Sequence, residues 1–151
     1  MMLGLLLCRG YNRYLALREA EVLGYLSLLR HVRGRISGLL LSAKDAAKSF
    51  SCPALEENGF LPRLREGESL SAAFTPAEST QRLPRGAAEA LRDYFSRSGR
   101  GGLDSELASI DLCIKELEAV CETEKGERKN RARVAGALIF AITVGGAILL
   151  L

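Results

Sequence analysis

The final stretch of this chain carries no charged side chain. It reads VAGALIFAITVGGAILLL, residues 134–151, and Thr143 is its only polar side chain. As a helix, such a run is about 27 Å long, close to the roughly 30 Å of a bilayer's hydrocarbon core. A helix buried in a soluble core usually keeps a polar face, and this run has none. The run therefore predicts a transmembrane helix over residues 134–151 rather than a core helix.

Basic residues stand immediately before this run. Residues 124–133 have a net charge of +3, which equals the formal net charge of the whole chain. Positive residues beside a span stay in the cytoplasm, where they also meet anionic headgroups. We interpret them as membrane-flanking residues that place the preceding domain in the cytoplasm. An RNA-binding patch is less favoured, because no aromatic residue is interleaved with the charges. The five basic residues are Lys125, Arg128, Lys129, Arg131 and Arg133.

The N-terminus is a short apolar stub, residues 1–9. Its apolar part, MMLGLLLC, would span only about 12 Å as a helix, too little to cross a bilayer. A signal-peptide remnant is one interpretation, although no basic region precedes it. The other is the cytoplasmic end of a truncated transmembrane helix, since Arg9, Arg13 and Arg18 follow as they would on the cytoplasmic side. In the second case the chain would be a hairpin with a span at each end.

The composition favours helices throughout. There are 27 Leu and 19 Ala, against 5 Val, 6 Ile and 4 Thr. Leu and Ala favour helices, whereas β-branched residues favour strands. We therefore predict an all-α fold, in which residues 10–133 form a compact cytoplasmic helical bundle ahead of the C-terminal transmembrane helix.

The first long helix is expected over about residues 14–41. Apolar residues recur there at spacings of three and four, which indicates one buried face. Ser42 followed by Asp45 resembles a capping box, so a second, short helix is expected from there to Phe50, stopped at Cys52-Pro53. The apolar positions of the first helix are Val22, Leu26, Leu29, Val32, Ile36 and Leu40.

Short elements follow between residues 60 and 98. Leu61-Pro62 opens a helical turn that buries Leu64, and residues 69–74 make another turn with Leu70 and Phe74 on one face. The sequence Thr-Pro-Ala-Glu at 75–78 has the cap, proline and glutamate of a helix start. Pro84 begins the next helix, and residues 99–102 form a glycine-rich joint. The apolar side of that helix consists of Leu91, Tyr94 and Phe95.

The last cytoplasmic helix is expected to begin with Asp104 as its N-cap. Five residues form a heptad-like seam along it, which we expect to pack within the chain against the first long helix, because so short a seam rarely dimerises alone. Helix propensity stays high through the basic residues, so this helix is expected to continue into the membrane as one rod. The seam consists of Leu107, Ile110, Ile114, Leu117 and Cys121.

The sequence holds no catalytic constellation. It has no GxxxxGK[ST] loop for nucleotides, and His31 is its only histidine. The four cysteines, at positions 8, 52, 113 and 121, form no CxxC pair, so reduced and partly buried thiols are expected. We therefore expect a non-enzymatic protein without a catalytic, cofactor-binding or metal site, and without a nucleic acid or small-molecule substrate.

Small residues repeat every four positions in the predicted span. Ala137, Ala141 and Gly145 form a small-xxx-small stripe, which lets helices approach closely in lipid. The partner would be a missing N-terminal span or another protein's helix. The alternative is that alanine and glycine are simply common in membrane helices.

Three stretches of the chain resemble the stage III sporulation protein AB family of endospore-forming bacteria. The stretch RYLALREAEVLGYLSLLRHVRGRISG, residues 13–38, is similar to the family's first cytoplasmic helix. The stretch LREGESLSAAF, residues 64–74, is also similar to a phrase in type II secretion F-domain proteins. Residues 103–151 match the family's ending, a capped helix and a charged rod that lead into a terminal span. The order of these stretches and the ending carry the resemblance.

The resemblance implies a function that the composition does not show. Members are non-enzymatic platform components of the mother-cell sporulation channel, a secretion-like complex in the membrane around the forespore. The expected partners are the membrane, other stage III sporulation proteins and the ATPase of that set, called the AA protein. The bulk of the chain would be cytoplasmic and would couple this ATPase to membrane partners. The alternative is a generic membrane-tethered helical adaptor or scaffold.

Overall fold

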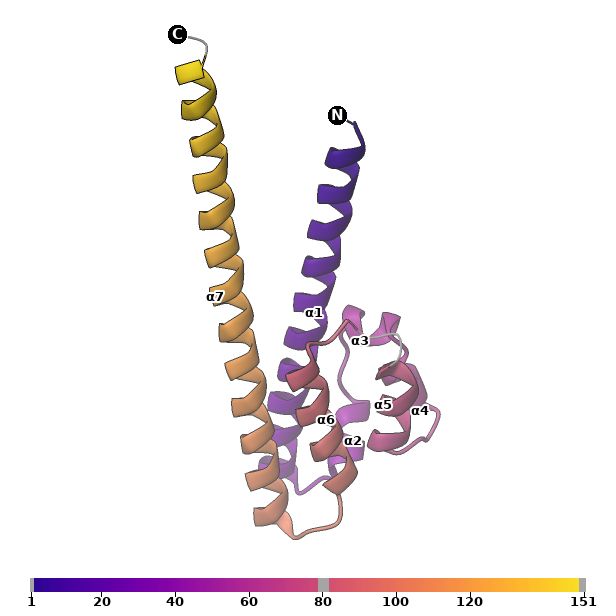
Figure 1. The fold of residues 1–151 in the computed structure, drawn as a ribbon. Helices are drawn as coiled ribbons and strands as arrows, with labels where there is room; N and C mark the ends of the chain where they lie inside the picture. Colours follow the sequence, from indigo (N-terminus) through magenta and orange to yellow (C-terminus); the bar gives the residue numbers. More distant parts are fainter. Residues whose placement is uncertain (1, 79–81, 150–151) are drawn as a thin grey trace. The chain divides into compact units, whose positions relative to one another are not determined.

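The structure, a computed structural model, describes the backbone of residues 2–78 and 82–149 and the side chains of residues 10–11, 13–78, 82–131 and 133–134. The described residues form helices and no strand, which confirms the predicted all-α class (Figure 1). By its contacts the chain divides into two units, residues 1–120 and 121–151. The helices are α1 (Met2–Leu39), α2 (Ala43–Lys48), α3 (Pro53–Glu57), α4 (Phe60–Arg65), α5 (Leu70–Glu78), α6 (Arg85–Arg97) and α7 (Leu103–Leu149).

Four aromatic rings from four helices form the centre of the first unit. Tyr25 of α1, Phe60 of α4, Phe74 of α5 and Phe95 of α6 lie with ring centroids 5.3–6.4 Å apart. Phe60 stacks on Phe95 and meets the other two rings edge-on. Such contacts add to the free energy that apolar burial alone provides. The short helices are therefore held by side chains that converge from segments distant in sequence.

The apolar face predicted for α1 is buried, except at its end. Val22, Leu26, Leu29, Val32 and Ile36 are all at most 5% exposed. Leu40 is 74% exposed, so its assignment to the buried face was wrong. The reason is local: α1 ends at Leu39, and Leu40 turns the chain with a left-handed φ of 52°. The helical periodicity that placed Leu40 on the buried face stops one residue earlier.

Helices α2 and α3 pack against α1. A Cβ atom at Gly24 would lie 3.1 Å from the Cys52 sulfur and 3.3 Å from Leu55 Cγ, so glycine permits the close approach of this segment to α1. The predicted capping box is confirmed, because the Asp45 backbone N–H donates to Ser42 Oγ over 3.2 Å. Helix α2 ends at Lys48, two residues before the predicted end.

The helix start predicted at residues 75–78 is wrong. These residues are instead the last turn of α5, which begins at Leu70 and contains Pro76. The Ser69 side chain caps this helix by accepting the Ala72 N–H over 3.1 Å. Leu70, Phe74 and other residues of α5 are buried, so apolar burial carries the helix through the proline. The proline costs only one backbone hydrogen bond there, near the helix end.

Three other boundaries differ from those predicted. Helix α1 begins at Met2, so the N-terminal apolar segment is continuous with the first long helix. Pro53 was predicted to end the preceding segment, but it also begins α3. It occupies the first turn of that helix, where its missing N–H costs no hydrogen bond. Asp104 is the second residue of α7 rather than its cap, and the Glu106 N–H bonds to the Gly102 carbonyl instead.

The predicted transmembrane helix falls almost wholly outside the residues whose side chains are described. Among the described residues, no helix is both long enough and apolar enough to span a membrane. The backbone of α7 is helical from Leu103 to Leu149, so the helix continues through the basic residues. The membrane assignment of residues 134–151 stays a prediction.

Candidate functional site

The basic residues predicted to flank the membrane lie on an exposed part of α7. Lys125, Arg128, Lys129, Arg131 and Arg133 are all exposed. Two of them meet carboxylates on the same helix, Lys125 with Glu122 at 3.4 Å and Arg131 with Glu127 at 3.5 Å. Exposed pairs of this kind contribute little to stability. Their charge is therefore accessible to a partner or to headgroups. The stripe Ala137, Ala141 and Gly145 lies outside the residues with described side chains and stays a prediction.

The predicted seam on α7 is buried only in part. Ile110 and Leu117 are fully buried, whereas Leu107, Ile114 and Cys121 are half-buried. The fully buried face is turned slightly from the predicted one, and it includes a carboxylate and a thiol that the sequence pattern did not select. The sequence pattern selects apolar side chains, so it omitted these two residues because of their charge or polarity. The buried face of α7 consists of Glu106, Ile110, Cys113 and Leu117.

Glu106 is the centre of a polar cluster where α6 meets α7. Its carboxylate accepts hydrogen bonds from Tyr94 OH at 3.0 Å, Ser98 Oγ at 2.7 Å and the Gly99 N–H at 3.0 Å. Burial raises the pKa of Tyr94, and the neighbouring Glu106 charge raises it further. A buried carboxylate is tolerated only when its oxygens are satisfied, as they are here. This cluster fixes the start of α7 against the end of α6.

Cys113 is a buried thiol in contact with α6. Its Sγ lies 3.6 Å from the Ala90 carbonyl oxygen, and burial raises the pKa of this thiol to about 12. A thiol with so high a pKa is protonated at neutral pH and is a poor nucleophile. Cys52, Cys113 and Cys121 form no disulfide among the described residues. Cys8 lies outside the described side chains.

This thiol gives an alkaline pH dependence of stability. The pKa is higher in the folded protein (about 12) than its ordinary 9.0, so the folded state retains the proton longer. The free energy of unfolding should thus fall between about pH 9 and pH 12, by at most about 1.4 kcal/mol per pH unit for this group. Cys113→Val removes the group and keeps an apolar side chain. Chemical denaturation under reducing conditions should show a shallower alkaline loss in the variant, and equal slopes would contradict the prediction.

Two ion pairs join α7 to α1. Arg30 Nη2 lies 2.6 Å from Glu118 Oε1, and Arg33 binds Asp111 with two of its nitrogens. The hydrogen bond from Arg33 lowers the pKa of Asp111. Since the later residue of α1 pairs with the earlier residue of α7, the two helices run antiparallel within residues 1–120. These ion pairs link the first long helix to the start of the last one, whereas packing of the seam itself against the first helix stays a prediction.

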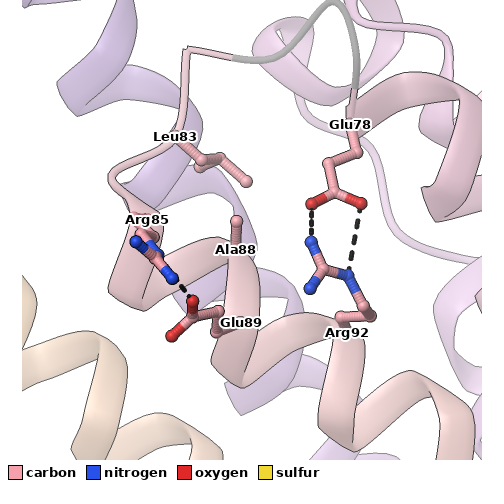
Figure 2. A pocket seen from close by; sticks show the side chains of 6 residues that line it. All are labelled: Glu78, Leu83, Arg85, Ala88, Glu89 and Arg92. Carbon is pink, nitrogen blue, oxygen red and sulfur yellow. Dashed lines mark hydrogen bonds and ion pairs between the residues drawn. The ribbon is translucent and has the colours of Figure 1, made fainter.

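A surface hollow of about 380 Å³ lies between the end of α5 and α6 (Figure 2). Two nitrogens of Arg92 donate hydrogen bonds to the Glu78 carboxylate, and Arg85 Nε donates one to Glu89 Oε1 over 2.8 Å. Figure 2 shows both arginines engaged with carboxylates of the same hollow. The two cations are neutralised locally, so the hollow offers an anionic ligand little attraction. The described residues also contain no cluster of three potential metal ligands.

The fold and these contacts define an all-helical bundle in which ion pairs join the two long antiparallel helices α1 and α7, and a buried polar cluster joins α6 to α7. This fold is similar to the solved structure of Stage III sporulation protein AB (SpoIIIAB), with a TM-score of 0.57 and 18% sequence identity. The match covers 74% of this chain and 95% of that chain. It confirms, for the fold, the resemblance seen in the sequence. No family model matches the chain, and no curated protein matches it by sequence.

Proposed function

We propose that this chain is a non-enzymatic component of a sporulation membrane complex and couples a cytoplasmic ATPase to membrane partners. The observation that carries the proposal is the fold shared with SpoIIIAB over 95% of that chain. The sequence stretches at residues 13–38, 64–74 and 103–151 support it independently, because they occur in the family's order. The proposed location is the mother-cell membrane around the forespore, with the helical bundle in the cytoplasm.

The membrane part of the proposal rests on the sequence beyond residue 133. Eighteen uncharged residues follow a cluster of exposed basic side chains, which is the arrangement of a span with its cytoplasmic flank. Lys129 and Arg133 are exposed cations near the start of this run. Anionic headgroups attract such residues by about 1 kcal/mol each.

The coupling part rests on α7. This helix is fixed to the bundle by Glu106, by Cys113 and by the ion pairs of Asp111 and Glu118. A helix transmits displacement along its axis better than a loop does, because its backbone hydrogen bonds hold its length. A partner that shifts the bundle would therefore displace the start of α7, and the continuous helix would carry that displacement toward residue 149.

Deleting the gene tests the proposal directly. We expect the count of heat-resistant spores to fall by several orders of magnitude, with recovery when the chain is supplied in trans. Purification of the tagged chain from solubilised membranes of sporulating cells should recover a secretion-type ATPase. Normal sporulation in the deletion strain would overturn the proposal. A sporulation defect without any ATPase in the purified complex would favour the generic adaptor instead.

The predicted small-residue stripe gives a narrower test of the membrane contacts. Replacing both Ala141 and Gly145 with Leu should reduce the yield of membrane partners in co-purification, because the larger side chains prevent close helix approach in lipid. Replacing Ile142 with Leu is the matched control, since it changes an apolar residue on another face without adding volume. An unchanged complex in the double variant would show that this stripe is not an interface.

A further inference from the structure

Four exposed leucines gather at one end of the bundle. Leu39, Leu40 and Leu41 follow one another where α1 ends, and Leu103 is the first residue of α7. Their exposed fractions are 58%, 74%, 38% and 44%. The antiparallel ion pairs place these two helix ends together: Leu39 lies about 9 Å beyond Arg33, and Leu103 lies about 12 Å before Asp111. Figure 1 shows the end of α1 and the start of α7 at the same end of the bundle. We call these four residues the leucine surface.

The backbone at Leu40 is unusual for this residue type. Its φ of 52° lies in the left-handed region, where glycine is the usual residue after a helix and a leucine is strained. The side chain gains no burial in return, being 74% exposed. Folding therefore gives no reason for leucine at this position. Backbone strain that is not offset by burial of the side chain points to a binding role for the residue.

Two exposed arginines flank the leucine surface. Arg35 lies one turn before Leu39 on α1, and Arg100 lies three residues before Leu103. Both side chains are exposed and make no ion pair among the described residues, unlike Arg33 and Arg97, which bind Asp111 and Asp93. The nearby Asp45 and Asp104 lie in the first turns of α2 and α7, where the helix dipole already stabilises their charges, and Asp45 also accepts a hydrogen bond from Ser42. A ligand would therefore meet apolar side chains flanked by two available guanidinium groups.

We propose that the leucine surface binds an amphipathic helix of a protein partner whose apolar stripe is flanked by carboxylates. The leucines would pack against the apolar stripe of the partner helix, and Arg35 and Arg100 would form ion pairs with its carboxylates. A lipid surface is less suited, because two cations are few for headgroup binding. The proposal rests on the proposed function only in requiring a protein partner, and it adds where that partner binds.

Fluorescence anisotropy with two labelled peptides tests the proposal on the full chain. One probe is a helical peptide with leucines at i, i+3, i+4 and i+7 and glutamates on both flanks; the other has lysine at each glutamate. We expect the acidic peptide to bind, and the basic peptide to bind at least about tenfold more weakly. Equal binding of the two peptides, or no binding up to about 100 μM, would overturn the proposal.

Three variants separate binding from folding. Leu40→Gly should weaken the acidic peptide about tenfold or more while leaving the thermal unfolding midpoint unchanged or higher, because glycine relieves the strain. The double variant Arg35→Glu, Arg100→Glu should weaken it similarly. Arg85→Glu is the control, a charge reversal at an exposed arginine at the far end of α6, and it should bind as the wild type does. The proposal would be overturned if Leu40→Gly bound the acidic peptide as tightly as the wild type does. It would also be overturned if the wild-type chain self-associated and Leu40→Gly dissociated it.

The spore count and the peptide assay test different proposals, so a negative result in one does not contradict the other proposal. Normal spores in the deletion strain would refute the sporulation function and leave peptide binding as measured. A chain that supports sporulation but binds neither peptide would refute the leucine surface alone.

Discussion

Ala119→Pro will abolish the formation of heat-resistant spores while leaving the protein in the membrane. Ala119 is an exposed residue in the interior of α7, so its side chain can be changed without creating a cavity. Proline there removes a backbone hydrogen bond and clashes with the preceding turn, at a cost of about 3 kcal/mol or more for a straight helix. The helix will kink between the bundle and the predicted span. Under the proposed function this interrupts the coupling, and spore counts measure it.

Ala119→Leu is the matched control for this experiment. Leucine is a good helix former, and the exposed position accepts its volume, so we expect spore counts close to those of the wild type. Membrane fractionation of both variants checks that each remains attached. Normal sporulation with Ala119→Pro would show that the continuity of α7 is not needed. Loss of the protein from the membrane fraction would assign the defect to anchoring.

Phe60→Ala should produce the largest loss of stability among single substitutions in the bundle. Phe60 is fully buried and contacts the rings of Tyr25, Phe74 and Phe95. Truncating such a ring costs about 3–5 kcal/mol through lost transfer energy and the cavity left behind. That is a large part of the 5–15 kcal/mol typical of a domain, so the unfolding midpoint should fall by roughly 10–20 °C. Denaturation of the full chain, followed by circular dichroism, measures the effect.

Phe50→Ala provides the comparison at the edge of the bundle. Phe50 is half-buried, and its ring contacts only His31 among the aromatic residues described. Removing a partly exposed ring should cost about 1–2 kcal/mol. The difference between the two variants tests whether the aromatic cluster is the centre of the fold. Equal losses would show that it is not.

Local rules of the sequence placed most of the helical segments. The Leu and Ala content predicted the all-α class, and the Ser42–Asp45 box correctly marked the start of α2. The apolar spacing identified the buried face of α1 up to Ile36 and the buried side of α6. These succeeded because hydrophobic periodicity and capping act within a few residues of each other. They require no knowledge of what lies across the bundle.

The same rules failed where tertiary packing outweighs a local signal. Thr75-Pro76 has the pattern of a helix start, but the burial of Leu70 and Phe74 makes it a helix end. Glu106 lies outside the predicted apolar seam, yet three donors from α6 and the following turn satisfy its carboxylate in a buried site. Such donors come from another element, so their presence cannot be read from the residues around Glu106.

The sequence by itself determined the helical class, the uncharged run at 134–151 with its basic flank, and the resemblance in stretch order to the sporulation family. Composition and charge along the chain carry that information, because helix propensity and transfer into lipid depend on each segment alone. Only the tertiary structure decided which face of α7 is buried, how Arg30 and Arg33 join α1 to α7, and that four leucines are left exposed at one end. Those features depend on which side chains meet in space, and that is set by packing between segments far apart in sequence.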